Sequence, residues 1–156
     1  MKINVMPIRS RVITLALFPI WLTACAPDLD TQLVQASRKG QGSRVKTLLA
    51  AGANPSATTR SGWTALIYAA ARGEAEAVNA LVKAGAPVDR SHRQADRGWT
   101  ALIYSAQGGH ILTAQILLEG GADVNVERSG MTALQMATSQ GHDDMIRLLE
   151  EAGATH

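Results

Sequence analysis

The sequence predicts an all-α protein, a solenoid of about four helix-turn-helix repeats joined by β-turn or hairpin loops. A heptapeptide, Gly62 to Tyr68, recurs identically from Gly98 to Tyr104, and a weaker copy runs from Gly130 to Met136. A Gly-Ala pair closes each copy, beginning at Gly52, Gly85, Gly121 and Gly153. A further glycine precedes each pair by 12 residues, at Gly40, Gly73, Gly109 and Gly141. Repetition at this spacing indicates modules that stack on one another.

The chain divides into three predicted parts. Residues 1–24 are expected to be a signal peptide and 25–30 a short tether. Residues 31–156 form the repeat domain, with repeats at about 31–58, 59–91, 95–127 and 128–156. Only positive charges occur from Met1 to Arg11, and Val12 to Leu22 is apolar apart from Thr14. This stretch is shorter than the ~20 residues of a membrane-spanning helix, and it matches the core of a secretory signal.

The segment Leu22-Thr23-Ala24-Cys25 resembles the lipobox of bacterial lipoproteins. The resemblance implies cleavage before Cys25, diacylglycerol on its sulfur and acylation of the new amino group. Because Ala26 follows the cysteine in place of aspartate, it also implies an outer-membrane protein that faces the periplasm. Two alternatives stay open: an ordinary signal peptide cut after Ala24 or Ala26, and an uncleaved amino-terminal anchor.

Charge is distributed unevenly along the chain. The 15 basic and 13 acidic residues give a net charge of +2, which becomes −1 when Lys2, Arg9 and Arg11 are removed with the signal peptide. Residues 38–97 carry net +6, residues 98–118 carry no charge, and residues 119–156 carry net −5. The positive half suits anionic lipid headgroups or an acidic protein, or is simply solvated surface. Nucleic acid is not expected as a partner.

The first helix of each repeat is predicted from its cap and its small residues. Thr64, Thr100 and Thr132 each precede an Ala-Leu step, and a threonine hydroxyl there accepts a hydrogen bond from an unpaired helix amide. The helix that begins at Ala65 is expected to end before Gly73, because glycine readily adopts a positive φ.

The second helix of each repeat is predicted from an apolar stripe at i, i+3 and i+4. Its members in the second repeat are Val78, Leu81 and Val82, and Gly85 ends that helix. The last repeat has Glu150 at the third stripe position. An end repeat has no neighbour to cover that position, so a polar residue costs little there.

These repeats resemble the ankyrin repeat. The residues that carry the resemblance are Gly109-His110, Gly141-His142 and the run from Gly121 to Asn125. The chain departs from the family pattern in having alanine for proline at Ala65, Ala101 and Ala133, and Ile67, Ile103 and Gln135 for histidine. The first copy starts near Thr31 and lacks the usual opening, as an amino-terminal cap does.

No catalytic or metal-binding constellation is recognisable. A single cysteine excludes a disulfide framework and a thiolate cage for zinc. His110 and His142 hold the helix-start position of the family, and Asp143-Asp144 suits a helix amino terminus. No phosphate-binding loop, dinucleotide fingerprint or nucleophile elbow occurs. We therefore expect no enzyme activity, no cofactor, no metal and no small-molecule substrate.

In the ankyrin family, partners usually meet the concave face, which consists of loop tips and inner-helix residues. Trp63 and Trp99 precede the capping threonines, and they are either partner anchors or packing residues. The loop 90–97 makes its repeat three residues longer than its neighbour, either as a binding finger or as neutral variation. The resemblance implies partner-binding positions at Arg60, Trp63, Arg72, Arg97, Trp99, Gln107, Met131 and Gln140. If the longer loop is a binding finger, it adds Arg90, His92 and Arg93.

The expected function is therefore a non-catalytic, monomeric module that binds a protein at the bacterial envelope. It would act as a scaffold or accessory of an envelope protein, or as an immunity protein against a periplasmic toxin. The alternative is a structural envelope protein whose basic first half contacts anionic lipid or cell wall.

Overall fold

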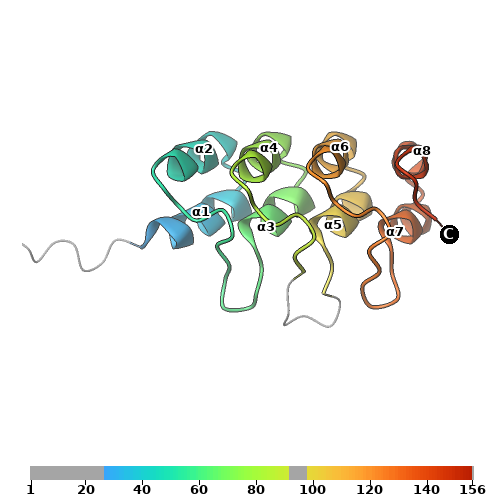
Figure 1. Ribbon diagram of the computed structural model, residues 1–156, viewed down its shortest axis with the longest axis horizontal. Helices are drawn as coiled ribbons and strands as arrows, with labels where there is room; N and C mark the ends of the chain where they lie inside the picture. Colours follow the sequence, from blue (N-terminus) through green and yellow to red (C-terminus); the bar gives the residue numbers. More distant parts are fainter. Residues whose placement is uncertain (1–26, 92–97, 156) are drawn as a thin grey trace, which may run out of the picture.

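The computed structural model describes residues 27–91 and 98–155, which form a row of four helix pairs (Figure 1). The first helices of the pairs are α1 (Leu29–Arg38), α3 (Ala65–Ala71), α5 (Ala101–Gly108) and α7 (Ala133–Gln140). The second helices are α2 (Gly42–Ala50), α4 (Ala75–Lys83), α6 (Ile111–Glu119) and α8 (Asp143–Glu151). The predicted all-α repeat fold is confirmed.

The helices lie in two layers (Figure 1). The inner layer consists of α1, α3, α5 and α7, each packed on the next, and the outer layer consists of α2, α4, α6 and α8. The loop between the first and second pairs and the loop between the third and fourth pairs project on the inner-helix side, away from the outer helices. Residues of the inner helices and of these loops therefore share one long face, which we call the inner face.

The threonine caps are confirmed in three repeats. Thr64 Oγ1 accepts a hydrogen bond from Ile67 N at 3.0 Å, and the caps of α5 and α7 repeat this contact. In α7 the cap is reciprocal, because Gln135 Oε1 also accepts a hydrogen bond from Thr132 N at 3.1 Å. Gln135, at a position where the family has histidine, thus completes a capping box.

The turn between the helices of a pair depends on the predicted mid-repeat glycine. Gly73 has a φ of +71°, and the histidine ring of the next repeat lies against it, so that a Cβ there would lie 2.5 Å from His110 Nδ1. Glycine alone satisfies both the positive φ and the close approach. The turn and the stacking of repeats 2 and 3 are therefore linked at one residue.

Helix α1 begins at Leu29, inside the predicted tether, because Asp28 caps it. Asp28 Oδ1 accepts a hydrogen bond from Thr31 N at 2.6 Å, and this contact holds the pKa of the carboxyl below its ordinary value. Thr31 lies within the helix and does not open it, unlike Thr64 in the next repeat. Asp28 thus replaces the missing cap of the first repeat.

The core follows the repeat pattern. Leu66 and Ile67 of repeat 2, Leu102 and Ile103 of repeat 3, and Leu134 of repeat 4 are buried, whereas Gln135 at the remaining equivalent position is exposed. Each buried leucine or isoleucine side chain contributes about 1.5–3 kcal/mol. Alanines at Ala65, Ala101 and Ala133 are also fully buried, and their small side chains let successive inner helices approach closely.

Two of the loops contain the expected hairpin contacts. Thr59 N donates to Trp63 O at 2.9 Å, and Thr58 and Thr64 form an isolated antiparallel bridge. Arg128 and Met131 exchange both backbone hydrogen bonds, at 3.0 and 3.1 Å. These contacts fix the residues that immediately precede α3 and α7.

The two ends of the solenoid carry polar residues where interior repeats carry buried ones. Ala77, Thr113 and Met145 are buried, whereas Arg44 at the equivalent position of the first repeat is exposed. Glu150 is likewise exposed at the far end, as the sequence predicted for a terminal repeat. Between the first two repeats, Lys46 Nζ lies 2.7 Å from Glu76 Oε1 on the outer layer.

Candidate functional site

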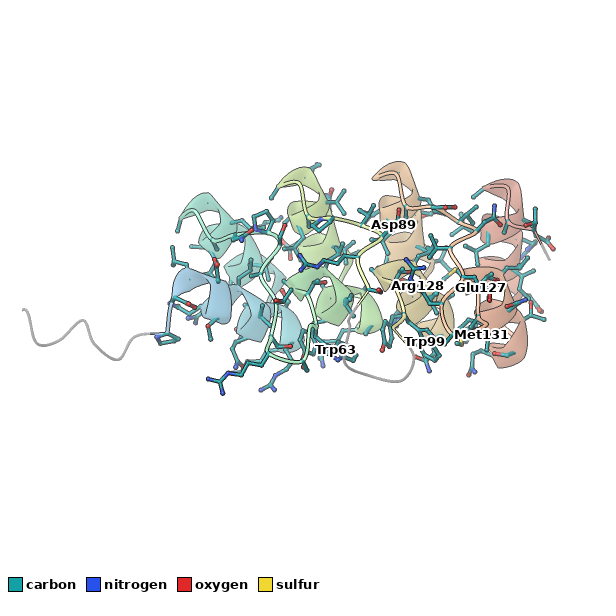
Figure 2. All side chains as sticks on the ribbon, turned by 60° about the horizontal axis from the view of Figure 1, so that its bottom comes forward. Trp63, Asp89, Trp99, Glu127, Arg128 and Met131 are labelled. Carbon is teal, nitrogen blue, oxygen red and sulfur yellow. The ribbon has the colours of Figure 1, made fainter. Side chains whose placement is uncertain are left out.

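The residue before each capping threonine occupies the same place in repeats 2, 3 and 4. These residues are Trp63, Trp99 and Met131, and Figure 2 shows them in a row along the inner face. Trp63 and Met131 are half-buried, whereas Trp99 is only 6% exposed. The three equivalent positions thus differ in how much side chain a partner would reach.

Both tryptophans belong to a contiguous aromatic cluster, which consists of Trp63, Tyr68, Trp99 and Tyr104. The ring of Trp63 stacks on Tyr68 of its own repeat, with centroids 4.9 Å apart, and lies 5.1 Å from Tyr104 of the next repeat. Trp99 meets Tyr104 edge-on at 5.3 Å. Each such ring contact stabilises the fold by about 0.5–1.5 kcal/mol beyond the contribution from burying apolar surface. Packing therefore accounts for Trp99, while Trp63 packs and keeps part of its side chain exposed.

A hollow of about 490 Å³ opens on the inner face between repeats 3 and 4, and we call it the inner-face hollow. Four of the predicted partner-binding positions meet here. Two lie in the last turns of α5 and α7, and two immediately precede the capping threonines of these helices. The lining residues are Trp99, Gln107, Ser129, Met131, Met136, Ser139 and Gln140.

The polar groups of the inner-face hollow differ in how far they are engaged. Ser139 Oγ donates to Met136 O at 2.8 Å, and Gln140 Nε2 lies 3.4 Å from Ser139 Oγ. The Gln107 side-chain amide makes no hydrogen bond to another described residue. The hollow therefore offers a free amide beside thioether and aromatic surface.

The predicted arginines lie apart from this hollow. Arg60, Arg72 and Arg90 are exposed, and they belong to repeat 2 and the loop that follows it. None of them lines the inner-face hollow, whose seven residues are all uncharged. The remaining predicted residues, Cys25, His92, Arg93 and Arg97, lie outside the described residues.

The two helix-start histidines join neighbouring repeats. His142 Nε2 lies 3.1 Å from the backbone oxygen of Gln107, so the first residue before α8 reaches the end of α5. His110 precedes α6 in the same way and lies over Gly73 of the preceding repeat. Both residues hold the helix-start position that the sequence predicted for them.

Two searches of the described residues bear on other classes of site. No group of three or more His, Cys, Asp or Glu side chains in residues 27–91 and 98–155 is placed to hold a metal ion. Within the same ranges, no helix has the length and hydropathy needed to cross a bilayer.

Sequence reasoning missed two serines of the inner-face hollow, Ser129 and Ser139, and three further residues of the site. Tyr68 and Tyr104 were assigned only to the repeated heptapeptide, and Met136 only to its weaker copy. Alignment of the repeats places all three at one position, which is the signal that could have revealed them. In the structure this position faces the residue that precedes the capping threonine.

A comparison with family models finds ankyrin repeats, described as three copies, at residues 33–128 and again at 88–156. A search of curated proteins finds no match for the chain. The two matched ranges together cover most of the sequence, and they include all eight helices except the first residues of α1. The chain therefore belongs to the ankyrin-repeat family.

Proposed function

We propose that this protein is a non-catalytic module that binds one partner protein through its inner face while a lipid on Cys25 holds it at the bacterial envelope. The observation that carries the proposal is the inner-face hollow, where four predicted partner-binding positions meet and half-buried Met131 lies beside the largely buried Trp99. Tryptophan is enriched among binding anchors, and methionine adapts its shape to a partner.

The outlying arginines extend this surface. Arg60, Arg72 and Arg90 are exposed in repeat 2, which also holds the half-buried ring of Trp63. An acidic rim on the partner would therefore meet repeat 2 while its uncharged centre meets repeats 3 and 4. Opposite charges at a rim mainly raise the rate of association and set the orientation of the two proteins.

The proposed anchor is supported by the lipobox-like segment and by the short distance along the chain from Cys25 to α1. Because α1 begins at Leu29, only Ala26, Pro27 and Asp28 separate Cys25 from the first helix. Lipid on Cys25 would hold the first repeat next to the bilayer, at the periplasmic side of the outer membrane. The role there is that of a scaffold or accessory of an envelope protein, or of an immunity protein that blocks a periplasmic toxin.

The test of partner binding is photo-crosslinking in living cells from positions 131 and 140. Position 112 is the matched control, because Leu112 is 60% exposed but lies on outer helix α6. We expect one protein to be captured from both inner-face positions and not from the control. Equal capture from all three positions, or from none, would contradict the proposal.

The anchor is tested separately by fractionation. The Cys25→Ser chain should leave the membrane fraction once its signal has been removed, whereas the native chain stays with the membrane. Persistent membrane association of the variant would show that acylation is not the anchor.

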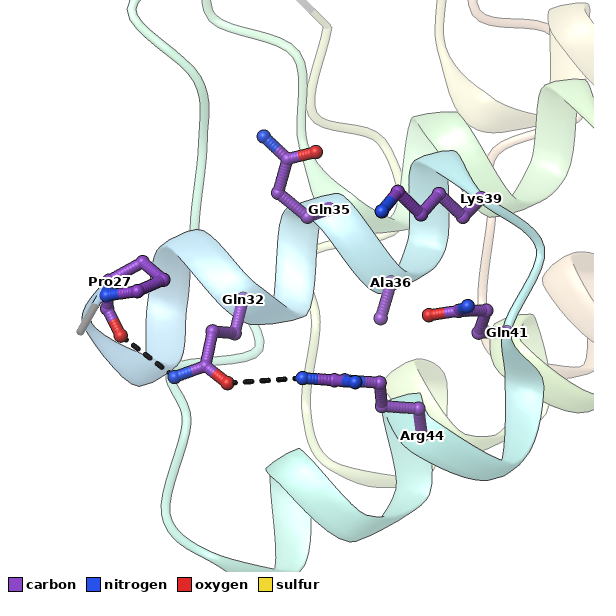
Figure 3. Close-up of a pocket in the computed structure, with 7 residues that line it drawn as sticks. All are labelled: Pro27, Gln32, Gln35, Ala36, Lys39, Gln41 and Arg44. Carbon is purple, nitrogen blue, oxygen red and sulfur yellow. Dashed lines mark hydrogen bonds between the residues drawn. The ribbon is translucent and has the colours of Figure 1, made fainter.

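One observation favours a second candidate function, contact with anionic lipid. The exposed end of repeat 1 has a hollow of about 410 Å³, lined by uncharged residues and by Lys39 and Arg44, with no carboxylate (Figure 3). Gln32 bridges its two sides, because its Nε2 donates to Pro27 O at 2.7 Å and its Oε1 lies 3.4 Å from Arg44 Nη2. This end adjoins the tether, so it would face phosphate headgroups.

The lipid-contact function is tested with the Cys25→Ser chain and vesicles that contain phosphatidylglycerol. Binding that falls with added salt, and falls further with Lys39→Gln and Arg44→Gln, would support it. The matched control is Arg128→Gln with Arg147→Gln, which removes the same charge from the last repeat. An equal loss of vesicle binding in both double variants would show that binding depends on net charge and not on the hollow at repeat 1.

A further inference from the structure

The inner face changes composition at repeat 4. The position before the capping threonine is Trp63, then Trp99, then Met131. The position four residues after that threonine is Tyr68, then Tyr104, then Met136. Both aromatic series thus end in methionine at the same repeat.

The methionines alter the junction between repeats 3 and 4. At the junction before it, the phenol ring of Tyr104 packs against Trp63, with centroids 5.1 Å apart. One repeat later, Trp99 takes the place of Trp63 and Met136 takes the place of Tyr104. An unbranched thioether does not fill the volume of a phenol ring, and the inner-face hollow lies at this point. The hollow therefore occupies the place where the repeat pattern would put the next aromatic rings.

The chemistry of the hollow selects among partner side chains. All seven lining residues are uncharged, and residues 98–118 carry no charge at all. A lysine, aspartate or glutamate would lose hydration there without gaining a counter-charge. Methionine sulfur makes favourable contacts with aromatic rings, and the Gln107 amide can hydrogen-bond to a hydroxyl at the ring's tip.

We infer that the inner-face hollow receives a tyrosine-like side chain from the partner protein, which completes the aromatic series that the chain itself discontinues at repeat 4. This inference rests on the proposed function and identifies the chemical class of the residue that the partner inserts. The ring would lie between Met131 and Met136 with its hydroxyl toward Gln107, in the role that Tyr104 has at the previous junction.

The direct test uses N-acetyl-tyrosinamide as the probe and the full chain labelled with ¹³C at its methionine methyl groups. We expect saturable shifts of the Met131 and Met136 signals, with the signal of buried Met145 on α8 unchanged as an internal control. N-acetyl-lysinamide and N-acetyl-leucinamide should bind about 10-fold more weakly or not at all. Equal shifts with all three probes, or none with the tyrosine probe, would overturn the inference.

A second test fills the hollow from within. Met136→Tyr continues the tyrosine series and Met131→Trp continues the tryptophan series, so each occupies the space intended for the partner ring. We expect each variant to lower probe affinity about 10-fold or more while the helical circular dichroism stays native. The matched control is Gln35→Tyr, which places the same ring at the equivalent, exposed position of repeat 1.

The two filling variants keep the test decisive if one of them unfolds. Native probe affinity in whichever variant folds would show that the ring does not enter this hollow. Failure of the inference is also distinguishable from failure of the proposed function. A partner captured from position 131, together with no tyrosine selectivity, would leave the function standing and reject only the aromatic occupant. Selective binding of the tyrosine probe without any captured partner would support the aromatic occupant and reject the proposed function.

Discussion

The rings of Trp63 and Tyr104 lie 5.1 Å apart across the junction of repeats 2 and 3, and the same indole stacks on Tyr68 of its own repeat at 4.9 Å. A single side chain thus connects two helix pairs, in addition to the packing of α3 on α5 and of α4 on α6. Removal of the Trp63 side chain is expected to lower folding stability whether or not it also weakens partner binding. Binding data for variants at this position therefore require a parallel measurement of folding.

Trp63→Ala should lower the free energy of unfolding by about 2–4 kcal/mol, because it deletes two ring contacts and leaves a gap between repeats. Trp63→Phe should cost less, since it keeps one ring. Equilibrium urea denaturation measures both variants. Arg60→Ala, at an exposed residue of the same loop, is the control and should change stability by no more than about 0.5 kcal/mol. A similar loss in Arg60→Ala would show that the aromatic contacts are not responsible.

Gly73→Ala should destabilise the protein more than Gly52→Ala does. Both glycines have positive φ, +71° and +94°, so both substitutions carry a backbone cost of about 1–2 kcal/mol. Only at Gly73 does the new Cβ also meet the His110 ring, whereas nothing lies within 4 Å at Gly52.

The contribution of His110 to that difference is measured by a double-mutant cycle. Gly73→Ala combined with His110→Ala should cost less than the sum of the two single variants, because the ring that clashes has gone. Strict additivity of the two free-energy changes would mean that the histidine moves aside without cost.

His142→Ala should lower stability by about 0.5–1.5 kcal/mol, the usual net contribution of one hydrogen bond. The bond lost is the one between His142 Nε2 and Gln107 O, which ties repeat 4 to repeat 3. Hydrogen exchange of the amides of α7 and α8 should rise in this variant. Asp143→Ala, at the adjacent exposed residue, serves as the comparison, and an identical exchange pattern in both variants would rule out a specific role for the ring.

Asp28 should make folding stability depend on acidity. Its pKa is lowered from 3.8 in the folded state by the hydrogen bonds from Thr31, so the ionised carboxylate is the form that the fold favours. The ionised carboxylate stabilises the fold above pH 3.8, and this stabilisation is lost as the pH falls through the lowered pKa of the folded state. The urea midpoints of the native chain and Asp28→Asn should therefore differ more at pH 7 than at pH 3. A constant difference would exclude ionisation as the cause.

Much of the fold was predictable because each repeat carries several independent local signals of its secondary structure. The capping threonines, the mid-repeat glycines and the apolar stripes all depend on neighbours within four residues along the chain. The start of α1 was predicted two residues late, because the first repeat uses Asp28 as its cap in place of Thr31.

The site was less predictable because it depends on contacts between repeats. Whether Trp99 is an anchor or a packing residue depends on its surroundings in the folded chain, including Tyr104, and not on its spacing from other tryptophans. The inner-face hollow depends on the size of Met136, which the sequence shows only as one more apolar residue. The positions 92–97 and the acylation of Cys25 stay predictions.

Because the helix pairs stack in a single row, the number of repeats sets the distance between the two ends of the protein. Neighbouring helices pack about 8–10 Å apart, so the junction of repeats 3 and 4 lies about 20–30 Å along the solenoid from Pro27. With the proposed anchor beside Pro27, that length becomes the maximum height above the bilayer at which the inner-face hollow can meet a partner. Deleting repeat 2, or adding a repeat before repeat 3, would shift that height by a fixed increment while leaving the hollow itself intact.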